Sequence, residues 1–198
     1  MSRTYGGRPA EDRAAERRQR LIDVGIDVVG RGGVAALGMR LVCREAGLSQ
    51  KFFYESFPNL EALVHAVYQA ALSKMEDAVA PSISAGDVRG GFDAAARLMQ
   101  SDPRLCRILL IEPFADADLR RYVRESAPGI VRGALGDFVG GTEDDPLVRM
   151  RYSALLGAQI SLFVEWTEGN LGADRDAFVD HATEVAKQLV GIGIGAGR

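Results

Sequence analysis

The stretch RLVCREAGLSQKFFYESF, residues 40–57, decides the fold, because it predicts two short helices joined by a tight turn. Gly47 stands just past the first helix, where a residue without a Cβ adopts the left-handed conformation at little cost. Ser49 is placed to cap the second helix with its hydroxyl, and Leu48 and Phe53 have the spacing of a hydrophobic staple. The stretch therefore predicts a helix-turn-helix unit, whose second helix presents its first residues to the major groove of DNA.

Helical spacing of apolar residues continues along the chain, and no segment shows the sustained alternation that marks a β-strand. Gly25 falls on the buried face of the first helix, where the missing side chain predicts the close approach of another helix. We expect an all-α fold, with helices at about 11–31, 39–46, 50–56, 60–79, 87–100, 103–114, 117–139, 146–167 and 175–190.

Capping and breaking residues set the ends of these helices. Asn59 is a good N-cap for the long fourth helix. Asp102 and Asp145 each precede a proline at the first helical position, which predicts a capped start at both places. We expect residues 81–86 to form a loop, and Pro128 to kink or split the helix in which it lies.

The fourth helix connects a small head to a larger body. We expect a flexible basic arm at 1–10, a helix-turn-helix DNA-binding domain at 11–57, a helical body at 58–190 and a flexible glycine-rich tail at 191–198. Residues 1–51 carry a net charge of +4 and the remainder −7, which together give the total of −3. A basic head on an acidic body fits a module that binds a polyanion. The arginines of the arm either reach phosphates or a minor groove, or belong to a solvated tail.

Composition excludes several other classes of protein. No apolar run approaches the roughly 20 residues that cross a bilayer, and the polar N-terminus has no secretory signal. Cys43 and Cys106 lie among apolar neighbours, which favours two buried free thiols in a reducing compartment. No cysteine or histidine cluster has metal-ligand spacing. We expect a cytoplasmic protein with no metal, no cofactor and no membrane partner.

The segment from about residue 20 to residue 67 resembles the TetR family (tetracycline-repressor-like) of transcriptional regulators. The family pattern is an Ile-Ala-x-x-Ala-Gly-Val-Ser turn followed by Leu-Tyr-x-His-Phe. The residues that carry the resemblance are Leu21-Ile22-Asp23, Gly33, Val42-Cys43-Arg44-Glu45-Ala46-Gly47-Leu48-Ser49, Phe53-Tyr54, Phe57, Asn59 and Glu61-Ala62-Leu63. Beyond Val67 the resemblance covers only helical architecture and length.

Four positions depart from the family pattern. Gly38 replaces the usual Ser or Thr cap of the second helix, and Val29 replaces an aromatic residue late in the first. Ser56 stands where the family has a histidine. Leu60 stands where the family has a lysine that contacts the DNA backbone, so the resemblance supports no such contact here.

The resemblance implies a homodimer that places its two heads in successive major grooves, about one helical turn apart. Two-fold symmetry then implies a palindromic operator. The body at 58–190 is implied to dimerise and to bind a small-molecule effector, which shifts the spacing between the heads and releases a repressor from DNA. The alternative is an activator or other regulator without an effector, whose body would be solid. We expect no enzymatic activity, because the chain has no nucleophile–base pair and no phosphate loop.

The predicted DNA contacts gather on the second helix of the motif. Lys51 can reach guanine acceptors and Gln50 can pair with adenine. Phe52 either contacts a thymine methyl group from the helix tip or is partly buried against the first helix. Tyr54 is expected to bind a phosphate through its hydroxyl. The complete predicted set is Arg40, Ser49, Gln50, Lys51, Phe52, Tyr54 and Ser56.

Large apolar residues of the body, with a few polar groups among them, are candidates for an effector pocket. These are Phe92, Met99, Leu109, Glu112, Phe114, Gln159, Phe163 and Trp166. Two stripes are candidates for a dimer interface: the small residues of helix 146–167, and one face of helix 175–190. Each stripe packs either against a second copy or within its own chain. The stripes are Ser153, Ala154, Gly157, Ala158 and Ser161, and Phe178, Ala182, Val185 and Leu189.

Overall fold

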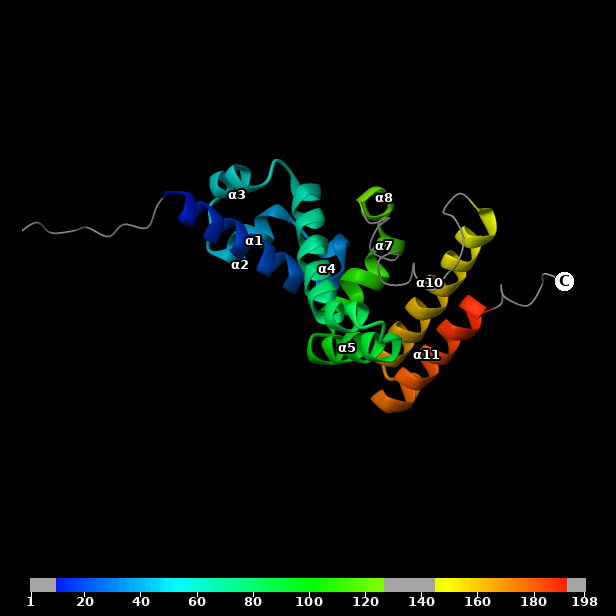
Figure 1. Cartoon of the computed structure of the whole chain (residues 1–198). Helices are drawn as coiled ribbons and strands as arrows, with labels where there is room; N and C mark the ends of the chain where they lie inside the picture. Colours follow the sequence, from blue (N-terminus) through cyan, green and yellow to red (C-terminus); the bar gives the residue numbers. More distant parts are fainter. Residues whose placement is uncertain (1–9, 127–144, 192–198) are drawn as a thin grey trace, which may run out of the picture.

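The structure is a computed structural model that describes residues 10–126 and 145–191. Its helices are α1 (Ala10–Gly32), the 3-10 turn η1 (Val34–Ala36), α2 (Met39–Ala46), α3 (Gln50–Ser56), α4 (Leu60–Ser84), α5 (Val88–Ser101), α6 (Arg104–Cys106), the π-helical segment η2 (Arg107–Ile111), α7 (Glu112–Ala115), α8 (Ala117–Ser126), α10 (Pro146–Thr167) and α11 (Arg175–Gly191). The described ranges contain no strand, so the predicted all-α fold is confirmed (Figure 1). The head of α1, α2 and α3 lies at one end and the α10–α11 pair at the other.

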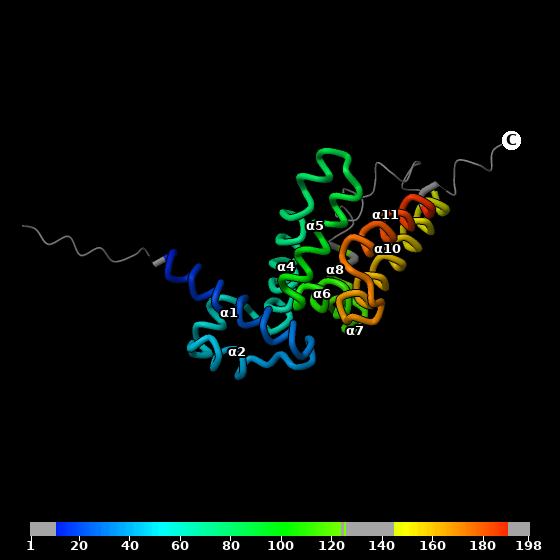
Figure 2. Tube along the Cα trace, turned by 90° about the horizontal axis from the view of Figure 1, so that it is seen from below, coloured from blue at the N-terminus to red at the C-terminus, as the bar shows by residue number. Residues whose placement is uncertain are grey.

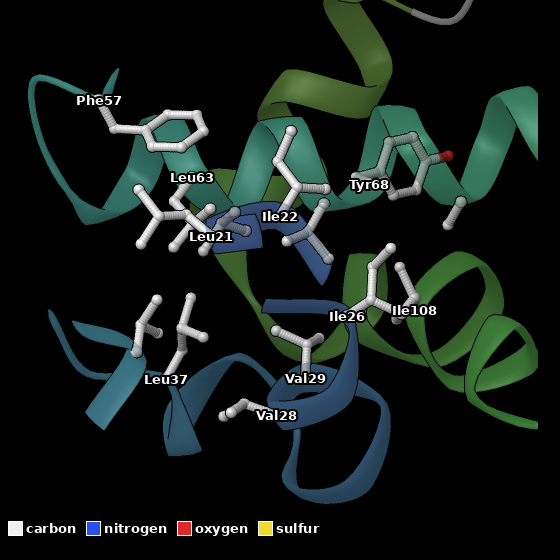
Figure 3. Close-up of a cluster of buried hydrophobic side chains, with 14 of the residues drawn as sticks. Leu21, Ile22, Ile26, Val28, Val29, Leu37, Phe57, Leu63, Tyr68 and Ile108 are labelled. Carbon is white, nitrogen blue, oxygen red and sulfur yellow. The ribbon is translucent and has the colours of Figure 1, made fainter. Parts of the chain in front are cut away.

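The head is built around one apolar core that α1 shares with α2, α3 and α4. Figure 3 shows Leu21 and Ile22 of α1 facing Leu63 of α4 and Phe57, which follows α3. Ile108 of η2 belongs to the same core and is 1% exposed. Burial of such side chains contributes about 1.5–3 kcal/mol each. The core therefore continues from the head into the first part of the body.

The helix α4 packs closely on α1 at Gly25, as the sequence predicts. A Cβ added to Gly25 would lie 2.5 Å from Cγ2 of Val67 and 3.6 Å from Cδ1 of Leu63. No methyl group fits at 2.5 Å unless a neighbour moves. The absence of a side chain at this position is therefore what allows the two helices to approach.

Gly25→Ala should lower the free energy of unfolding by about 1 kcal/mol. Overpacking against Val67 costs about 1–3 kcal/mol, and the gain in helix propensity offsets only about 1 kcal/mol of this. Gly91→Ala in α5 is a matched control, because the new Cβ would make an ordinary 3.9 Å contact with Ser82. That control should raise the free energy by about 0.5–1 kcal/mol. Urea unfolding measures both variants, and effects of the same sign would argue against the close approach.

The turn between α2 and α3 has the predicted geometry. Gly47 is left-handed, with φ 64° and ψ 33°, and its N–H donates to the carbonyl of Arg44. The helix after the turn spans Gln50–Ser56, as predicted. The predicted side-chain cap is wrong: Ser49 occupies the N-cap position, but its hydroxyl makes no capping hydrogen bond within the described chain. This end of α3 is exposed, so water can satisfy its first N–H groups in place of the hydroxyl.

The helix α4 carries the chain from the head into the body (Figure 1). Asn59 caps it as predicted, with Oδ1 accepting from the backbone N–H of Ala62 at 2.8 Å. The predicted loop at 81–86 is wrong in its first part, because α4 continues through Pro81 to Ser84. A proline cannot donate to the carbonyl one turn earlier, but this last turn is exposed and water can reach the freed carbonyl.

The body has a second core, formed mainly by α5, α10 and α11. Its centre is aromatic: the rings of Trp166 and Phe178 are stacked with centroids 4.3 Å apart, and Phe163 meets Phe178 edge-on at 4.9 Å. Such pairs add about 0.5–1.5 kcal/mol to the burial of the rings themselves. These contacts hold α10 and α11 side by side, as both views show (Figures 1 and 2).

The two predicted Asp-Pro starts have different outcomes. Asp145 caps α10 as predicted, and its Oδ1 accepts from the N–H of Leu147 at 2.8 Å. The cap predicted at Asp102 is wrong, because its carboxylate accepts from Nε and Nη2 of Arg104 at 2.6 and 2.7 Å. The guanidinium holds the pKa of the Asp102 carboxyl below its usual value. A charged donor competes better for a carboxylate than a backbone N–H does.

The predictions for the helix at 103–114 and for the two cysteines are confirmed, whereas others concern residues that the structure does not describe. The helix predicted at 103–114 is the run α6, η2 and α7, which ends at Ala115. Cys43 and Cys106 are both buried, and burial raises the pKa of each thiol. The arm at 1–9, the predicted kink at Pro128 and residues 192–198 of the tail lie outside the described residues. Among the described helices, none combines the length and the apolar character that a bilayer span requires.

Candidate nucleic-acid interface

The outer face of α3 presents three of the predicted DNA-binding residues together. Gln50, Lys51 and Tyr54 are exposed; the Lys51 side chain is 81% accessible and Tyr54 is 57% accessible. On the inner face, Phe53 and Phe57 are almost fully buried in the head core. The buried aromatic residues therefore fix the helix while its polar residues remain accessible to a ligand.

Phe52 is half-buried rather than exposed at the helix tip. The guanidinium of Arg17 in α1 lies over its ring, 4.5 Å from the centroid, and that of Arg18 lies over Phe57 at 4.7 Å. Cation–π contacts of this kind contribute about 0.5–1 kcal/mol at exposed sites. Of the two alternatives for Phe52, the structure shows partial burial against the first helix. A contact of Phe52 with DNA stays a prediction.

Glu55 connects the exposed side of α3 to α1. Its carboxylate lies 3.7 Å from Nη2 of Arg17 and 4.0 Å from Nζ of Lys51. Partly exposed pairs of this kind contribute at most about 1 kcal/mol each. Their consequence is positional, because they hold the Arg17 guanidinium against α3 and keep the Lys51 ammonium close to the helix.

Sequence reasoning missed the part that Arg17 and Arg18 play in supporting α3. A signal was available: each precedes a buried residue by four positions, Leu21 and Ile22 respectively. Residues four apart lie on the same face of a helix, so both arginines extend the core-facing side of α1 toward α3.

The other predicted contacts lie at the margin of this surface. Arg40 and Ser49 are exposed at the N-terminal ends of α2 and α3. The Ser56 hydroxyl donates to the carbonyl of Phe52 at 3.0 Å, so its proton is engaged within α3. Leu60 packs against the head core. Donation from the Ser56 hydroxyl to DNA would therefore require that this internal hydrogen bond break first.

The predicted effector residues do not converge on one pocket. The second core contains Phe92, Met99, Phe163 and Trp166. Leu109 belongs instead to the head core, and Phe114 is 58% exposed. An open pocket lies between α4, α5 and the start of α11, and none of the predicted residues lines it. Its lining is Ala78, Ala94, Arg97, Leu98, Gln100, Ser101 and Arg175.

The two polar effector candidates have different surroundings. Glu112 is 4% exposed, and its Oε2 accepts from the backbone N–H of Val34 at 2.8 Å. It is therefore turned toward the head and away from the second core. Gln159 is 7% exposed and donates through Nε2 to the carbonyl of Ala182 at 3.0 Å. Its Oε1 is buried and accepts no hydrogen bond from any described residue, which leaves an acceptor one turn from Phe163.

The described residues leave one face of α10 uncovered, whereas they bury Phe178 and Ala182 of the predicted α11 stripe. Phe178 and Ala182 of α11 are buried in the second core. Leu147 and Met150 are 56% and 58% exposed, and the small residues that follow at helical spacing are also exposed. This face, called the α10 face below, consists of Leu147, Met150, Ala154, Gly157 and Ser161.

Comparison with known families finds a match in the head. The profile of the tetR family of bacterial regulatory proteins matches residues 21–67, the segment that contains the α2–α3 turn and the first part of α4. No curated protein matches the chain.

Comparison with solved structures extends the likeness over the whole chain. The multidrug binding protein EbrR, solved with imidazole, is 25% identical, with all of both chains covered and a TM-score of 0.67. The fatty acid degradation regulator FadR from Bacillus halodurans is 16% identical over 92% of this chain and 97% of that one, with a TM-score of 0.67. FadR from Bacillus subtilis, solved with stearoyl-CoA, is 16% identical over 85% and 96%, with a TM-score of 0.67. At 16% identity the likeness concerns the fold alone.

Proposed function

Because this chain belongs to the TetR family of DNA-binding transcriptional regulators, we propose that it is a repressor that leaves its operator when a small molecule binds its body. The observation that carries the proposal is the outer face of α3. There Gln50, Lys51 and Tyr54 are accessible on a helix whose inner side is anchored by Phe53 and Phe57. A helix anchored in this way can enter a major groove as a rigid element and read base edges from its N-terminal residues.

The α10 face supports the proposal that two chains act together. Large exposed apolar side chains followed by small residues at helical spacing suit close packing of helices from two copies. A two-fold dimer contains two heads in opposite orientations, which matches an operator with palindromic half-sites. Binding through two heads also raises the affinity well above that of one head.

Two features of the body support an effector that has an apolar part. The aromatic side chains of Phe163, Trp166 and Phe178 form an apolar core, and Oε1 of Gln159 is a buried acceptor near them. A ligand site is typically apolar with a few placed polar groups. EbrR is named a multidrug binding protein, and FadR from Bacillus subtilis was solved with stearoyl-CoA. Of these ligands, stearoyl-CoA carries a long apolar acyl chain.

Release from the operator is the direct test of the proposed function. An operator is first selected from random DNA with the wild-type protein. The labelled complex is then titrated with long-chain acyl-CoA thioesters and with hydrophobic organic cations. We expect at least one compound to weaken operator binding by about tenfold or more, within the 5–150-fold range typical of coupled sites. With that compound, Gln159→Leu should reduce release while operator affinity in its absence stays unchanged.

Other outcomes separate the alternatives. A compound that raises the melting temperature of the protein without changing operator affinity would contradict effector-controlled release. A body that binds none of the compounds would favour a regulator without an effector. Turnover of a bound compound would favour an enzyme with a DNA-binding head.

A further inference from the structure

We propose that Glu112 is a positioning residue through which the body holds the DNA-binding head at the end of α1. The inference rests on the proposed function, because it assigns to one contact the coupling that effector-controlled release requires. Glu112 lies at the start of α7 and Val34 lies just after α1, 78 positions earlier in the chain. No local pattern in the sequence predicts this contact.

The carboxylate of Glu112 is seated on the backbone of the head. Oε2 accepts the Val34 N–H at 2.8 Å, and Oε1 accepts from Nη1 of Arg107 at 3.3 Å. Gly33 provides the space: a Cβ there would lie 2.8 Å from Oε1 of Glu112, and the φ of Gly33 is +79°. The side chain is 4% exposed, so loss of this contact would leave buried polar groups without partners.

A second contact fixes the same end of α1. Arg104 of α6 hydrogen-bonds Asp27 of α1, and its side chain packs against Gly30. Asp27 and Gly30 lie three residues apart near the end of α1, and Gly33 follows directly after the helix. The body therefore contacts the end of this helix at Asp27 and the residue pair just after it at Val34, and the chain then continues through η1 into α2.

The segment that carries Glu112 lies between the two cores of the molecule. Ile108 belongs to the head core and Cys106 to the second core, while Leu110 packs against both. Residues 107–111 form a π-helical segment, a wide turn that is often found at functional sites. Tightening of this segment to α-helical register would rotate the next residues by roughly 100°. Such a rotation, caused by a ligand in the second core, would remove the Glu112 carboxylate from Val34.

Hydrogen exchange measures the contact independently of DNA. In Glu112→Ala, the amides of residues 33–37 should exchange at least about tenfold faster than in the wild type, while those of α10 keep their protection. Glu112→Gln keeps an acceptor for Val34 and should stay within about threefold of the wild type. Glu184→Ala removes an exposed carboxylate from α11 and should change nothing at 33–37. If Glu112→Ala does not fold, Glu112→Asp withdraws the carboxylate by one methylene and should show the same local increase.

Operator affinity then tests the consequence for function. With the operator selected by the wild type, Glu112→Ala should bind about tenfold more weakly, and Glu112→Gln should restore most of the affinity. Unchanged exchange at 33–37 in Glu112→Ala and Glu112→Asp would overturn the contact. Faster exchange with wild-type operator affinity would overturn its role in positioning the head. If the wild-type protein selects no operator, the proposed function fails. The hydrogen-exchange measurement still decides whether Glu112 holds the end of α1.

Discussion

Replacing Gln50 and Lys51 together with alanine should weaken operator binding about a hundredfold and leave the fold intact. Each side chain is exposed on the outer face of α3, so its removal leaves no cavity. A good base contact is worth about 1–3 kcal/mol, and two contacts of about 1.4 kcal/mol each give a hundredfold change. Fluorescence anisotropy at fixed salt measures the affinity, and circular dichroism checks the fold.

The control for this variant is Lys187→Ala, which removes an exposed lysine from α11, far from the head in Figure 1. It should keep the wild-type affinity. The effect of Phe52→Ala on DNA binding would be harder to interpret, because the ring also lies under the guanidinium of Arg17 and supports α3. Wild-type affinity in the Gln50/Lys51 double variant would show that α3 is not the helix that reads the operator.

Ala154→Glu on the α10 face should convert a dimer into a monomer and weaken operator binding by a hundredfold or more. A carboxylate at the centre of an apolar contact between two chains is desolvated without a partner, which is strongly unfavourable. Loss of the second head then removes an avidity gain of about 10²–10⁴. Analytical ultracentrifugation gives the oligomeric state, and anisotropy gives the affinity.

Ala80→Glu is the matched control, because it makes the same substitution at an exposed alanine near the end of α4. It should remain a dimer and bind the operator as the wild type does. If Ala154→Glu also remains a dimer, the α10 face does not mediate the association of two chains.

The head was predictable from the sequence because its determinants are local. Gly47 takes the left-handed conformation that the turn requires, and α3 has the predicted bounds. Asn59 caps α4 by accepting a hydrogen bond from the N–H three residues later, and Gly25 lies where α4 packs against α1. The first three of these features depend on neighbours within a turn or two. The contact of Gly25 is with Val67, distant in the chain, and it was predictable because only glycine leaves room for a helix at that position.

The features that the sequence did not predict depend on partners distant along the chain or on competition between partners. The sequence predicts Glu112 as a polar group of an effector pocket, yet its partner Val34 belongs to the head. Asp102 has the pattern of a cap, but the guanidinium of Arg104 takes its carboxylate. Pro81 has the pattern of a helix end, but an exposed last turn tolerates it. The effector residues are hardest to predict, since apolar side chains serve a core and a pocket equally well.

Selection of bound sequences from random DNA, followed by measurement of the stoichiometry on the selected site, tests the central claim most directly. We predict one enriched sequence with two-fold symmetry and half-sites about one helical turn apart, bound by two chains. Its affinity should fall steeply with salt, as phosphate contacts require. An absence of enrichment, or an enriched site without symmetry that binds a single chain, would contradict the account.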